Sequence, residues 1–264
     1  MYDFSYSKAA SVADAVKALG DAEAKVIAGG QTFIPVLKQR LNKPSKVVDL
    51  AGLKDLVGIR REGGRFVIGA MTTHHAVATN ADIRAALPGL SHMASHIGDT
   101  QVRHRGTMGG SLANNDPSAC YPSAVLALKG TIVTDRRRIA ADDYFQGMFT
   151  TALEPDEIIT AIELPVAEKT AYMKFPNPAS RYAMVGVFVA RGKDGVRVTV
   201  TGAGQNGVFR HAAAEEALAK SFTPDAVANV TISADGLNSD IHASAEYRAH
   251  LIGVMTKRAV AAAG

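Results

Sequence analysis

The chain has 264 residues, with 29 lysines and arginines against 25 aspartates and glutamates, which gives a formal net charge of +4 at pH 7. Hydrophobic residues make up 47% and charged residues 20% of the chain, which excludes a disordered, collagenous or low-complexity protein. The small positive charge and the absence of tryptophan argue against a nucleic-acid partner, so the composition predicts a globular protein of roughly one to three domains.

The first predicted elements alternate between helix and strand. Apolar residues at helical spacing predict a helix over Ser11–Leu19, and Lys25–Ala28 is a short apolar strand that runs into a pair of glycines. A helix over Thr32–Leu41, capped by its first residue, follows the glycines, and Lys46–Leu50 is a further strand. The order strand, glycine turn, helix can provide an anion-binding site.

The middle of the chain begins with a predicted hairpin, whose strands are Leu56–Arg60 and Arg65–Ala70. The stretch His74–Ile97 has helical spacing interrupted by Pro88, which predicts two short helices leading to a second glycine-rich stretch. After that stretch the pattern predicts one helix and two strands, at Tyr121–Leu128, Thr131–Thr134 and Glu157–Leu164.

The segment Pro165–Lys169 is the best candidate for a domain boundary, because its proline ends the preceding strand. The residues beyond it are predicted to form three strands and three helices, at Ala171–Phe175, Ala183–Ala190, Val196–Thr201, His211–Lys220, Pro224–Val230 and Ala245–Ala263. This pattern is typical of a small α+β domain.

Two glycine-rich segments are candidate phosphate-binding sites. In Gly29–Thr32 (GGQT) two glycines precede a helix, where free N–H groups and the helix dipole favour an anion, although this segment alone fits an ordinary capped turn better. In Thr107–Asp116 (TMGGSLANND) a second glycine pair allows close approach of the backbone, and hydroxyl and amide side chains supply donors. Two such segments without the lysine of a Walker loop favour a dinucleotide over a nucleoside triphosphate with magnesium.

The segment Gly202–Gly207 (GAGQNG) matches the Rossmann fingerprint letter for letter. Too little chain follows it for a second parallel strand that ends in an acidic ribose contact, so we interpret it as a turn before a helix.

Histidines and arginines form three further clusters. His92 and His96 lie one helical turn apart and His74 and His75 are adjacent, but no carboxylate motif accompanies them, so we predict no metal site. The run Arg136–Arg138 fits a solvated strand end, with docking of an acidic surface as the alternative.

Cys120 is the only cysteine, which excludes an internal disulfide, a four-cysteine zinc site and an iron-sulfur cluster held by this chain alone. The N-terminus lacks the basic opening and apolar run of a signal peptide, and no later stretch reaches about 18 apolar residues. We therefore expect a cytoplasmic protein with no integral membrane segment.

Three segments carry a more specific pattern: Ala28–Leu41 (AGGQTFIPVLKQRL), Ile68–His74 (IGAMTTH) and Ile97–Pro117 (IGDTQVRHRGTMGGSLANNDP). Together they resemble the FAD-binding medium subunit of molybdenum hydroxylases, the flavoproteins of xanthine dehydrogenase and aerobic carbon monoxide dehydrogenase. The resemblance runs in order over nearly the whole chain and includes Ala243–Leu251 (ASAEYRAHL), which is similar to the C-terminal domain of the carbon monoxide dehydrogenase type.

The resemblance implies an α+β fold with a two-subdomain FAD-binding unit of the vanillyl-alcohol oxidase (PCMH) type and a small α+β C-terminal domain. The FAD-binding subdomains would be residues 1–55 and 56–167, and the C-terminal domain, like that of carbon monoxide dehydrogenase flavoproteins, residues 168–264. FAD would lie between the two subdomains.

The resemblance also implies which residues bind FAD. Backbone N–H groups of two segments would hold the pyrophosphate, Ile97 and Ile159 would pack on the cofactor, Lys174 would lie near the flavin and Tyr182 would flank its ring. The full set of implied cofactor-binding residues is Ala28, Gly29, Gly30, Gln31, Thr32, Phe33, Ile97, Thr107, Gly109, Gly110, Ser111, Asp116, Cys120, Ile159, Lys174 and Tyr182.

The chain departs from the family pattern in three places. The family usually has ADPAAD where this chain has Asn115–Cys120, so Cys120 replaces an aspartate that would hydrogen-bond the cofactor. The four-cysteine insert of benzoyl-CoA reductase flavoproteins is absent, which excludes that subclass. The segment GAGQNGVFR stands where a proline-containing loop is common.

The function implied by the resemblance is that of an oxidoreductase subunit for electron transfer. Its FAD would take electrons from iron-sulfur clusters on a small partner subunit and pass them to an external acceptor, while a large molybdenum-pterin subunit oxidises the substrate. No residue of this chain would be catalytic, and the complex would be a dimer of heterotrimers. Two alternatives remain open: a stand-alone FAD-dependent oxidoreductase that uses a nicotinamide cofactor, and a non-catalytic nucleotide-binding module.

Overall fold

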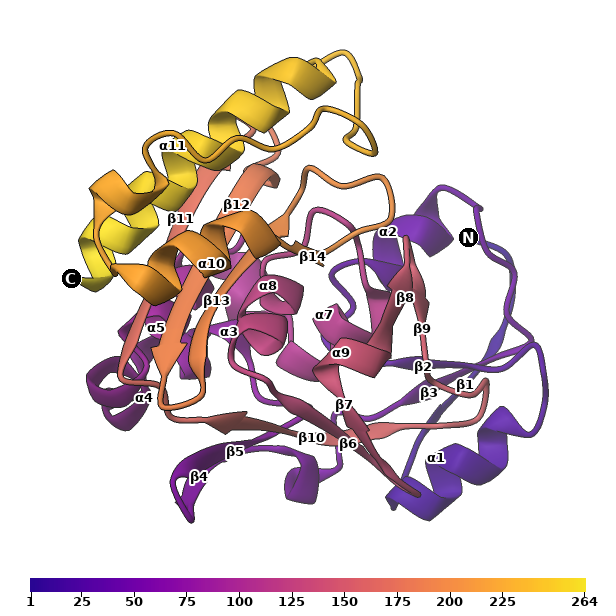
Figure 1. Cartoon of the computed structure of the whole chain (residues 1–264). Helices are drawn as coiled ribbons and strands as arrows, with labels where there is room; N and C mark the ends of the chain where they lie inside the picture. Colours follow the sequence, from indigo (N-terminus) through magenta and orange to yellow (C-terminus); the bar gives the residue numbers. More distant parts are fainter.

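The computed structural model describes residues 1–264 as a mixed α+β chain with four β-sheets. One of the three larger sheets lies in each of the ranges 1–55, 56–167 and 168–264, and the fourth sheet is a small hairpin within the middle range. Figure 1 shows how these sheets follow one another along the chain.

The N-terminal sheet is parallel, with the strand order β1-β3-β2. Its strands are β1 (Ser5–Lys8), β2 (Lys25–Ile27) and β3 (Lys46–Asp49). Helix α1 (Val12–Leu19) connects β1 to β2, and it begins as predicted because the Ser11 hydroxyl accepts a hydrogen bond from the Asp14 amide.

Helix α2 is shorter than the predicted helix over Thr32–Leu41. It covers Phe33–Lys38 and ends there because Arg40 takes a left-handed φ of 60°. Thr32 stands at the N-cap position, but its φ of −102° and ψ of −49° are helical and its side chain makes no capping hydrogen bond. The predicted cap is therefore wrong, and the Thr32 hydroxyl is left free.

The middle sheet is antiparallel, with the strand order β4-β5-β10-β6-β7. In that order its strands are Ile59–Glu62, Arg65–Gly69, Ile159–Pro165, Thr131–Thr134 and Arg138–Ala140. The first two strands form the predicted hairpin, although residues Lys54–Leu56 before it form a 3-10 helix, η1. The separate hairpin consists of β8 (Phe145–Gly147) and β9 (Thr150–Thr151).

Short helices fill the middle range between these strands. They are α3 (His74–Thr79), α4 (Ala81–Ala86), α5 (Pro88–Ser95), α6 (Thr100–Arg105), α7 (Met108–Asn114), α8 (Tyr121–Ala127) and α9 (Ala141–Tyr144). The stretch His74–Ile97 thus holds three helices instead of the predicted two, because Asn80 ends α3 and caps α4 with its side chain.

Helix α7 lies within the second glycine-rich segment. The helix begins after Thr107, whose hydroxyl accepts a hydrogen bond of 3.1 Å from the Gly110 amide. A Cβ atom at Gly109 would lie 2.6 Å from the Cβ of Ala70, and the Gly109 amide donates to the Ala70 carbonyl over 2.8 Å. Gly109 is therefore required for the close packing of α7 on the chain just after β5.

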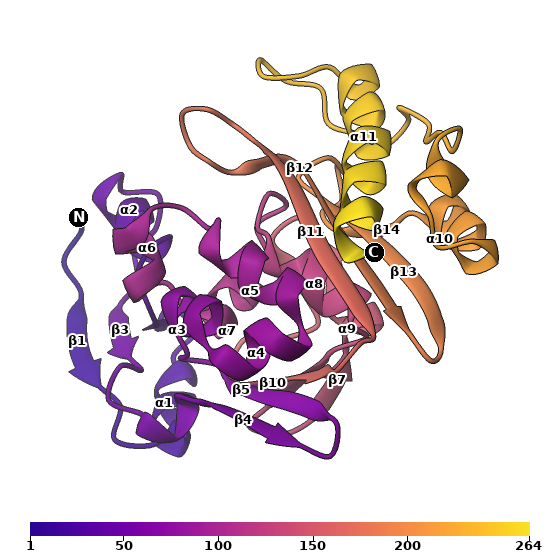
Figure 2. The ribbon, with the colours of Figure 1, turned by 90° about the vertical axis from the view of Figure 1, so that its left-hand side faces the viewer.

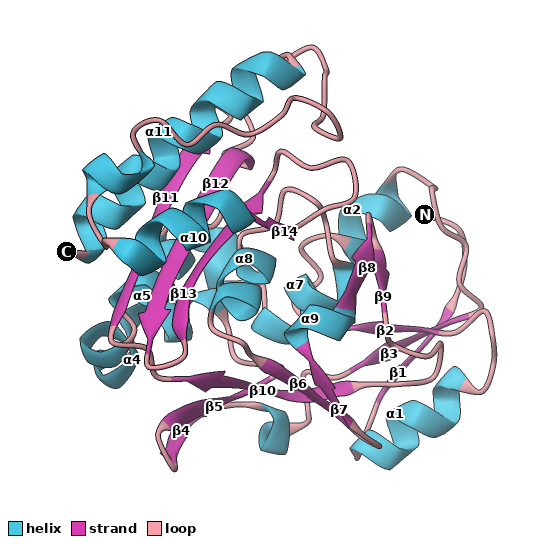
Figure 3. Ribbon diagram, viewed as in Figure 1, coloured by secondary structure: helices cyan, strands magenta, loops and turns pink.

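The C-terminal sheet is antiparallel, with the order β11-β12-β13-β14 and the strands Lys169–Pro176, Ala183–Gly192, Gly195–Thr201 and Phe209–Arg210. Helices α10 (Ala212–Lys220) and α11 (Ala245–Ala263) pack on one face, as Figures 2 and 3 show, and the 3-10 helix η2 (Pro224–Val227) contacts both helices. Helices α5 and α8 of the middle range cover the other face. None of the helices combines the length and apolar character that crossing a membrane requires.

The C-terminal sheet and the middle range share one hydrophobic interior. Tyr172 and Phe188, on β11 and β12, belong to the same core of 28 buried residues as Phe66 and Tyr121. A second core of 15 residues lies between the sheet and helices α10 and α11. The shared interior fixes the position of β11 relative to α5 and α8.

The segment Gly202–Gly207 does not form a Rossmann turn. It follows β13, a strand of an antiparallel sheet, and it leads into the short strand β14 before α10 begins. Gly204 forms an isolated bridge with Leu237, so the segment is pinned to a second loop.

Candidate cofactor site

A cavity of about 740 Å³ lies where the N-terminal range, the middle range and the start of the C-terminal sheet meet. All sixteen residues that the sequence analysis assigns to cofactor binding lie in its wall. They are Ala28, Gly29, Gly30, Gln31, Thr32, Phe33, Ile97, Thr107, Gly109, Gly110, Ser111, Asp116, Cys120, Ile159, Lys174 and Tyr182. A volume of this size suits a large organic ligand.

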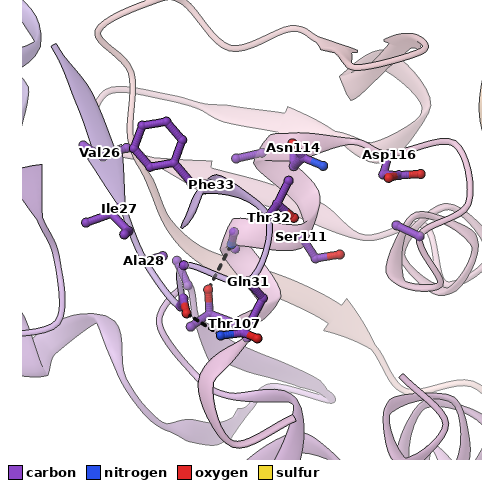
Figure 4. Close-up of a pocket in the computed structure, with 18 of the residues that line it drawn as sticks. Val26, Ile27, Ala28, Gln31, Thr32, Phe33, Thr107, Ser111, Asn114 and Asp116 are labelled. Atoms are coloured by element: carbon purple, nitrogen blue, oxygen red, sulfur yellow. Dashed lines mark hydrogen bonds between the residues drawn. The ribbon is translucent and has the colours of Figure 1, made fainter. Parts of the chain in front are cut away.

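The two glycine-rich segments meet in the wall of this cavity. A Cβ atom at Gly29 would lie 2.1 Å from the carbonyl oxygen of Arg105, at the end of α6, and one at Gly110 would lie 3.6 Å from the Cβ of Ala28. Figure 4 shows their labelled side chains, among them Thr32 and Ser111, converging on the same space. The two segments therefore form one site.

The segment before α2 presents a run of free amides. None of the backbone N–H groups of Gly29 to Phe33 donates a hydrogen bond within the chain. Gly30 makes this run possible because its φ of 73° is left-handed, a conformation that favours glycine. Successive free N–H groups ahead of a helix form a cradle for an anion such as a diphosphate.

The amides of the second segment are already used within the chain. Those of Met108, Gly109, Gly110 and Ser111 donate to the Thr72 carbonyl, the Ala70 carbonyl, the Thr107 hydroxyl and the Thr107 carbonyl. In this structure these four amides are therefore not free to hold the pyrophosphate, contrary to the expectation from the resemblance. Because Gly110 has no side chain, it leaves space beside the cradle.

Polar side chains next to the cradle can replace these amides as donors. The side chains of Thr32, Ser111 and Asn114 line the cavity and have no hydrogen-bond partner in the chain. Asp116 adds a carboxylate that accepts a hydrogen bond of 2.8 Å from the Ser118 amide, and burial raises the pKa of this carboxyl group. The wall thus offers both donors and an acceptor to a polar ligand.

Strand β11 and the loop after it supply another part of the wall. Lys174 donates a hydrogen bond of 2.9 Å to the His96 carbonyl, and its Nζ lies 3.6 Å from the Sγ of Cys120. Tyr182 is 49% exposed, so its ring covers the wall at the surface. Burial, followed by the nearby Asp116, raises the pKa of Tyr182.

Comparison with known proteins identifies the family. The family described as "FAD binding domain in molybdopterin dehydrogenase" matches residues 2–167. The chain is 37% identical to the carbon monoxide dehydrogenase medium chain of Afipia carboxidovorans, over 97% of this chain and 95% of the relative. This chain belongs to the FAD-binding medium subunits of molybdopterin dehydrogenases.

Two further members of the family extend the comparison. The nicotine 6-hydroxylase medium subunit of Paenarthrobacter nicotinovorans is 36% identical, over 98% of this chain and 96% of the relative. The crystal structure of quinoline 2-oxidoreductase from Pseudomonas putida 86 contains a similar chain at 29% identity, with a TM-score of 0.88 over 99% of this chain and 96% of that chain. The fold is therefore that of the medium subunits.

The residues of the cavity fit FAD, the cofactor of this family. The free amides of Gly29 to Phe33 match the need of its diphosphate for N–H donors, and a Cβ at Gly110 would enter the space between Thr107 and Ala28. Apolar walls, including Ile97 and Ile159, suit its ring systems.

Several residues of the wall are absent from the sequence prediction. They include Asn42, His74, Leu153, Pro155, Glu157 and Ile158. Leu153 to Ile158 precede β10, which lies between β5 and β6, so the sheet order brings this segment to the cavity. The sequence carries no local signal for such a placement, except that Ile159 follows the segment directly.

His74 is held uncharged in the wall. It is 5% exposed, its ring packs on that of Tyr121 at 5.3 Å, and its Nδ1 has no partner. Burial, followed by the positive charge of Arg103, lowers the pKa of His74 from 6.5 to about 4. Folding thus requires the neutral imidazole.

We expect the free energy of unfolding to fall as the pH decreases from 6.5 to 4, because the unfolded state protonates His74 first. The loss from this group is about 2–3 kcal/mol. Urea denaturation over this pH range should show a weaker pH dependence in His74→Asn, and an unchanged one in His250→Asn at the exposed surface. Equal slopes in the wild type and His74→Asn would contradict this assignment.

The pair His92 and His96 and the arginine run form contacts within the chain. The His96 ring bonds to the His92 carbonyl, and no group of three or more metal-ligating side chains gathers anywhere in the chain. Arg136 pairs with Asp156, Arg137 with Glu157 and Arg138 with Glu163. The arginine run is thus neutralised by ion pairs, which argues against the alternative of docking an acidic surface.

Proposed function

We propose that this chain is the electron-transfer flavoprotein subunit of a molybdenum hydroxylase complex. Bound FAD would supply the redox chemistry, taking up electrons from iron-sulfur clusters on a partner and passing them to an external acceptor. The observation that carries the proposal is the cavity with five consecutive free amides, in a chain that belongs to the FAD-binding medium subunits.

The residues of this chain would bind and orient the cofactor. The amides of Gly29 to Phe33 would hold the diphosphate, with Thr32, Ser111 and Asn114 as further donors. Ile97 and Ile159 would keep water from the flavin, and Lys174 and Tyr182 would lie at its edge. The cofactor supplies the redox chemistry and the chain binds and orients it, so we assign no catalytic residue.

The substrate of the complex would bind on another subunit. Chains that are 37%, 36% and 29% identical to this one belong to proteins named for carbon monoxide, nicotine and quinoline. A chain type common to such different substrates supports a role downstream of substrate oxidation. We therefore assign no substrate to this chain.

The partners would be a small iron-sulfur subunit and a large molybdenum-pterin subunit, assembled with this chain as a dimer of heterotrimers. The membership of the chain among medium subunits supports the existence of partners. Light scattering on the purified complex tests the stoichiometry, and a mass equal to a single heterotrimer would contradict the dimer.

Replacing Gly110 with valine tests the placement of FAD. The added side chain would enter the space beside Ala28, and its Cβ would lie 2.9 Å from the Thr107 hydroxyl, which must then shift although the backbone angles of Gly110 are ordinary. We expect a folded chain that retains less than about a tenth of the wild-type FAD, equivalent to a loss of at least about 1.4 kcal/mol. Flavin released on denaturation is the measure, and full FAD content in Gly110→Val would refute the placement.

A further inference from the structure

The Lys174 ammonium forms no ion pair within the chain, and the cavity it lines also holds the Asp116 carboxylate. The polar partners of Lys174 are the His96 carbonyl at 2.9 Å and the Cys120 Sγ at 3.6 Å. Lys174 and Cys120 both line the cavity. A carboxylate at position 120 would lie within ion-pair distance of this ammonium. With cysteine at this position, that carboxylate ion pair is absent.

The groups behind Cys120 add no negative charge. Tyr121 and Tyr172 are fully or almost fully buried, and neither hydroxyl has a hydrogen-bond partner. Burial, followed by the neighbouring Cys120, raises the pKa of both phenols, so they stay neutral. Lys174 donates the hydrogen bond of 3.6 Å that reaches the Cys120 Sγ, and the Tyr172 hydroxyl lies beside the same thiol.

Uptake of electrons by a flavin places negative charge on its ring, and a cation in the same cavity favours that reduced form. We propose that Cys120 acts as a positioning residue that leaves the Lys174 charge without an ion pair and thereby raises the reduction potential of the bound FAD. This inference rests on the proposed function, because it requires FAD in the cavity. It assigns to the lone cysteine a role in setting the direction of electron transfer.

The test compares three single variants and one double variant of the full-length chain loaded with FAD, and the single variants are Cys120→Ser, Cys120→Asp and Lys174→Met. We expect Cys120→Asp and Lys174→Met each to weaken the binding of reduced FAD relative to oxidised FAD at least tenfold. This change lowers the two-electron reduction potential of the bound FAD by about 30 mV. Cys120→Ser, which adds no carboxylate, should shift the potential by much less than Cys120→Asp does. In the double variant Cys120→Asp/Lys174→Met the two shifts should not add, because both remove the same charge.

Spectroelectrochemical titration of the flavin is the measurement. The inference is overturned if Lys174→Met does not lower the potential, or if Cys120→Ser and Cys120→Asp shift it equally. If Cys120→Asp fails to fold or retain FAD, the potential of Lys174→Met decides alone. A wild-type chain that binds no FAD would instead refute the proposed function.

Discussion

Replacing Gly29 with alanine is expected to abolish FAD retention. The added Cβ would lie 2.1 Å from the Arg105 carbonyl oxygen and 2.8 Å from the Gly106 Cα, both backbone atoms that cannot rotate away. The segment Gly29 to Phe33 must then move off the turn before α7, which takes its free amides out of position. Loss of two hydrogen bonds to a charged diphosphate costs at least about 3 kcal/mol, or roughly a hundredfold in affinity.

Fluorescence titration of the FAD-free chain with FAD measures this effect. Gly192→Ala is the matched control, because nothing lies within 4 Å of its added Cβ and the residue has no left-handed φ. It should bind FAD as the wild type does. An FAD affinity of Gly29→Ala within a few-fold of the control would show that the two glycine segments do not form the cradle together.

The Glu157→Gln variant is expected to lose about 1–3 kcal/mol of unfolding free energy at pH 7. The buried carboxylate accepts hydrogen bonds from Arg137 at 2.9 and 2.7 Å, from the Thr134 hydroxyl at 2.7 Å and from the Glu154 amide at 2.9 Å. The Arg137 hydrogen bonds are the main reason that the pKa of Glu157 falls from 4.5 to about 2. The expected loss is smaller than the full pKa shift implies, because Arg137 is 42% exposed and solvent screens the pair.

The pH dependence of this effect has a definite sign. A carboxyl group whose folded pKa is depressed adds stability that is complete above pH 4.5 and is lost as the pH falls toward 2. The difference between the wild type and Glu157→Gln in urea denaturation should therefore shrink over this range. The exposed ion pair of Arg60 and Glu62 provides the control, and Glu62→Gln should change stability by less than about 0.5 kcal/mol. A constant difference between pH 7 and pH 2 would contradict the assignment.

Local sequence signals predict most of the secondary structure and the segments of the site. Glycine pairs, helical spacing and the resemblance place Gly29 to Phe33 and the segment around Gly110 in one cavity wall. They cannot predict which amides are free, because the Met108 and Gly109 amides donate to the carbonyls of Thr72 and Ala70, residues brought near only by the fold.

Long-range contacts also explain the other features of the site that the sequence does not predict. The contact between Lys174 and Cys120 joins residues 54 positions apart, and it depends on α8 packing on the C-terminal sheet. Glu157 reaches the cavity wall because β10 lies between β5 and β6, an order that no local pattern predicts. Arg137, which the sequence assigns to a solvated strand end, is its partner for the same reason.

The most direct test of the electron-transfer assignment is the flavin, iron and molybdenum content of the complex that purifies with a tagged full-length chain from its own host. Because FAD on this chain would receive electrons from clusters held by a partner, we expect FAD, iron and molybdenum to co-purify in constant proportion through successive columns. A chain that purifies loaded with FAD but free of iron and molybdenum would contradict the assignment.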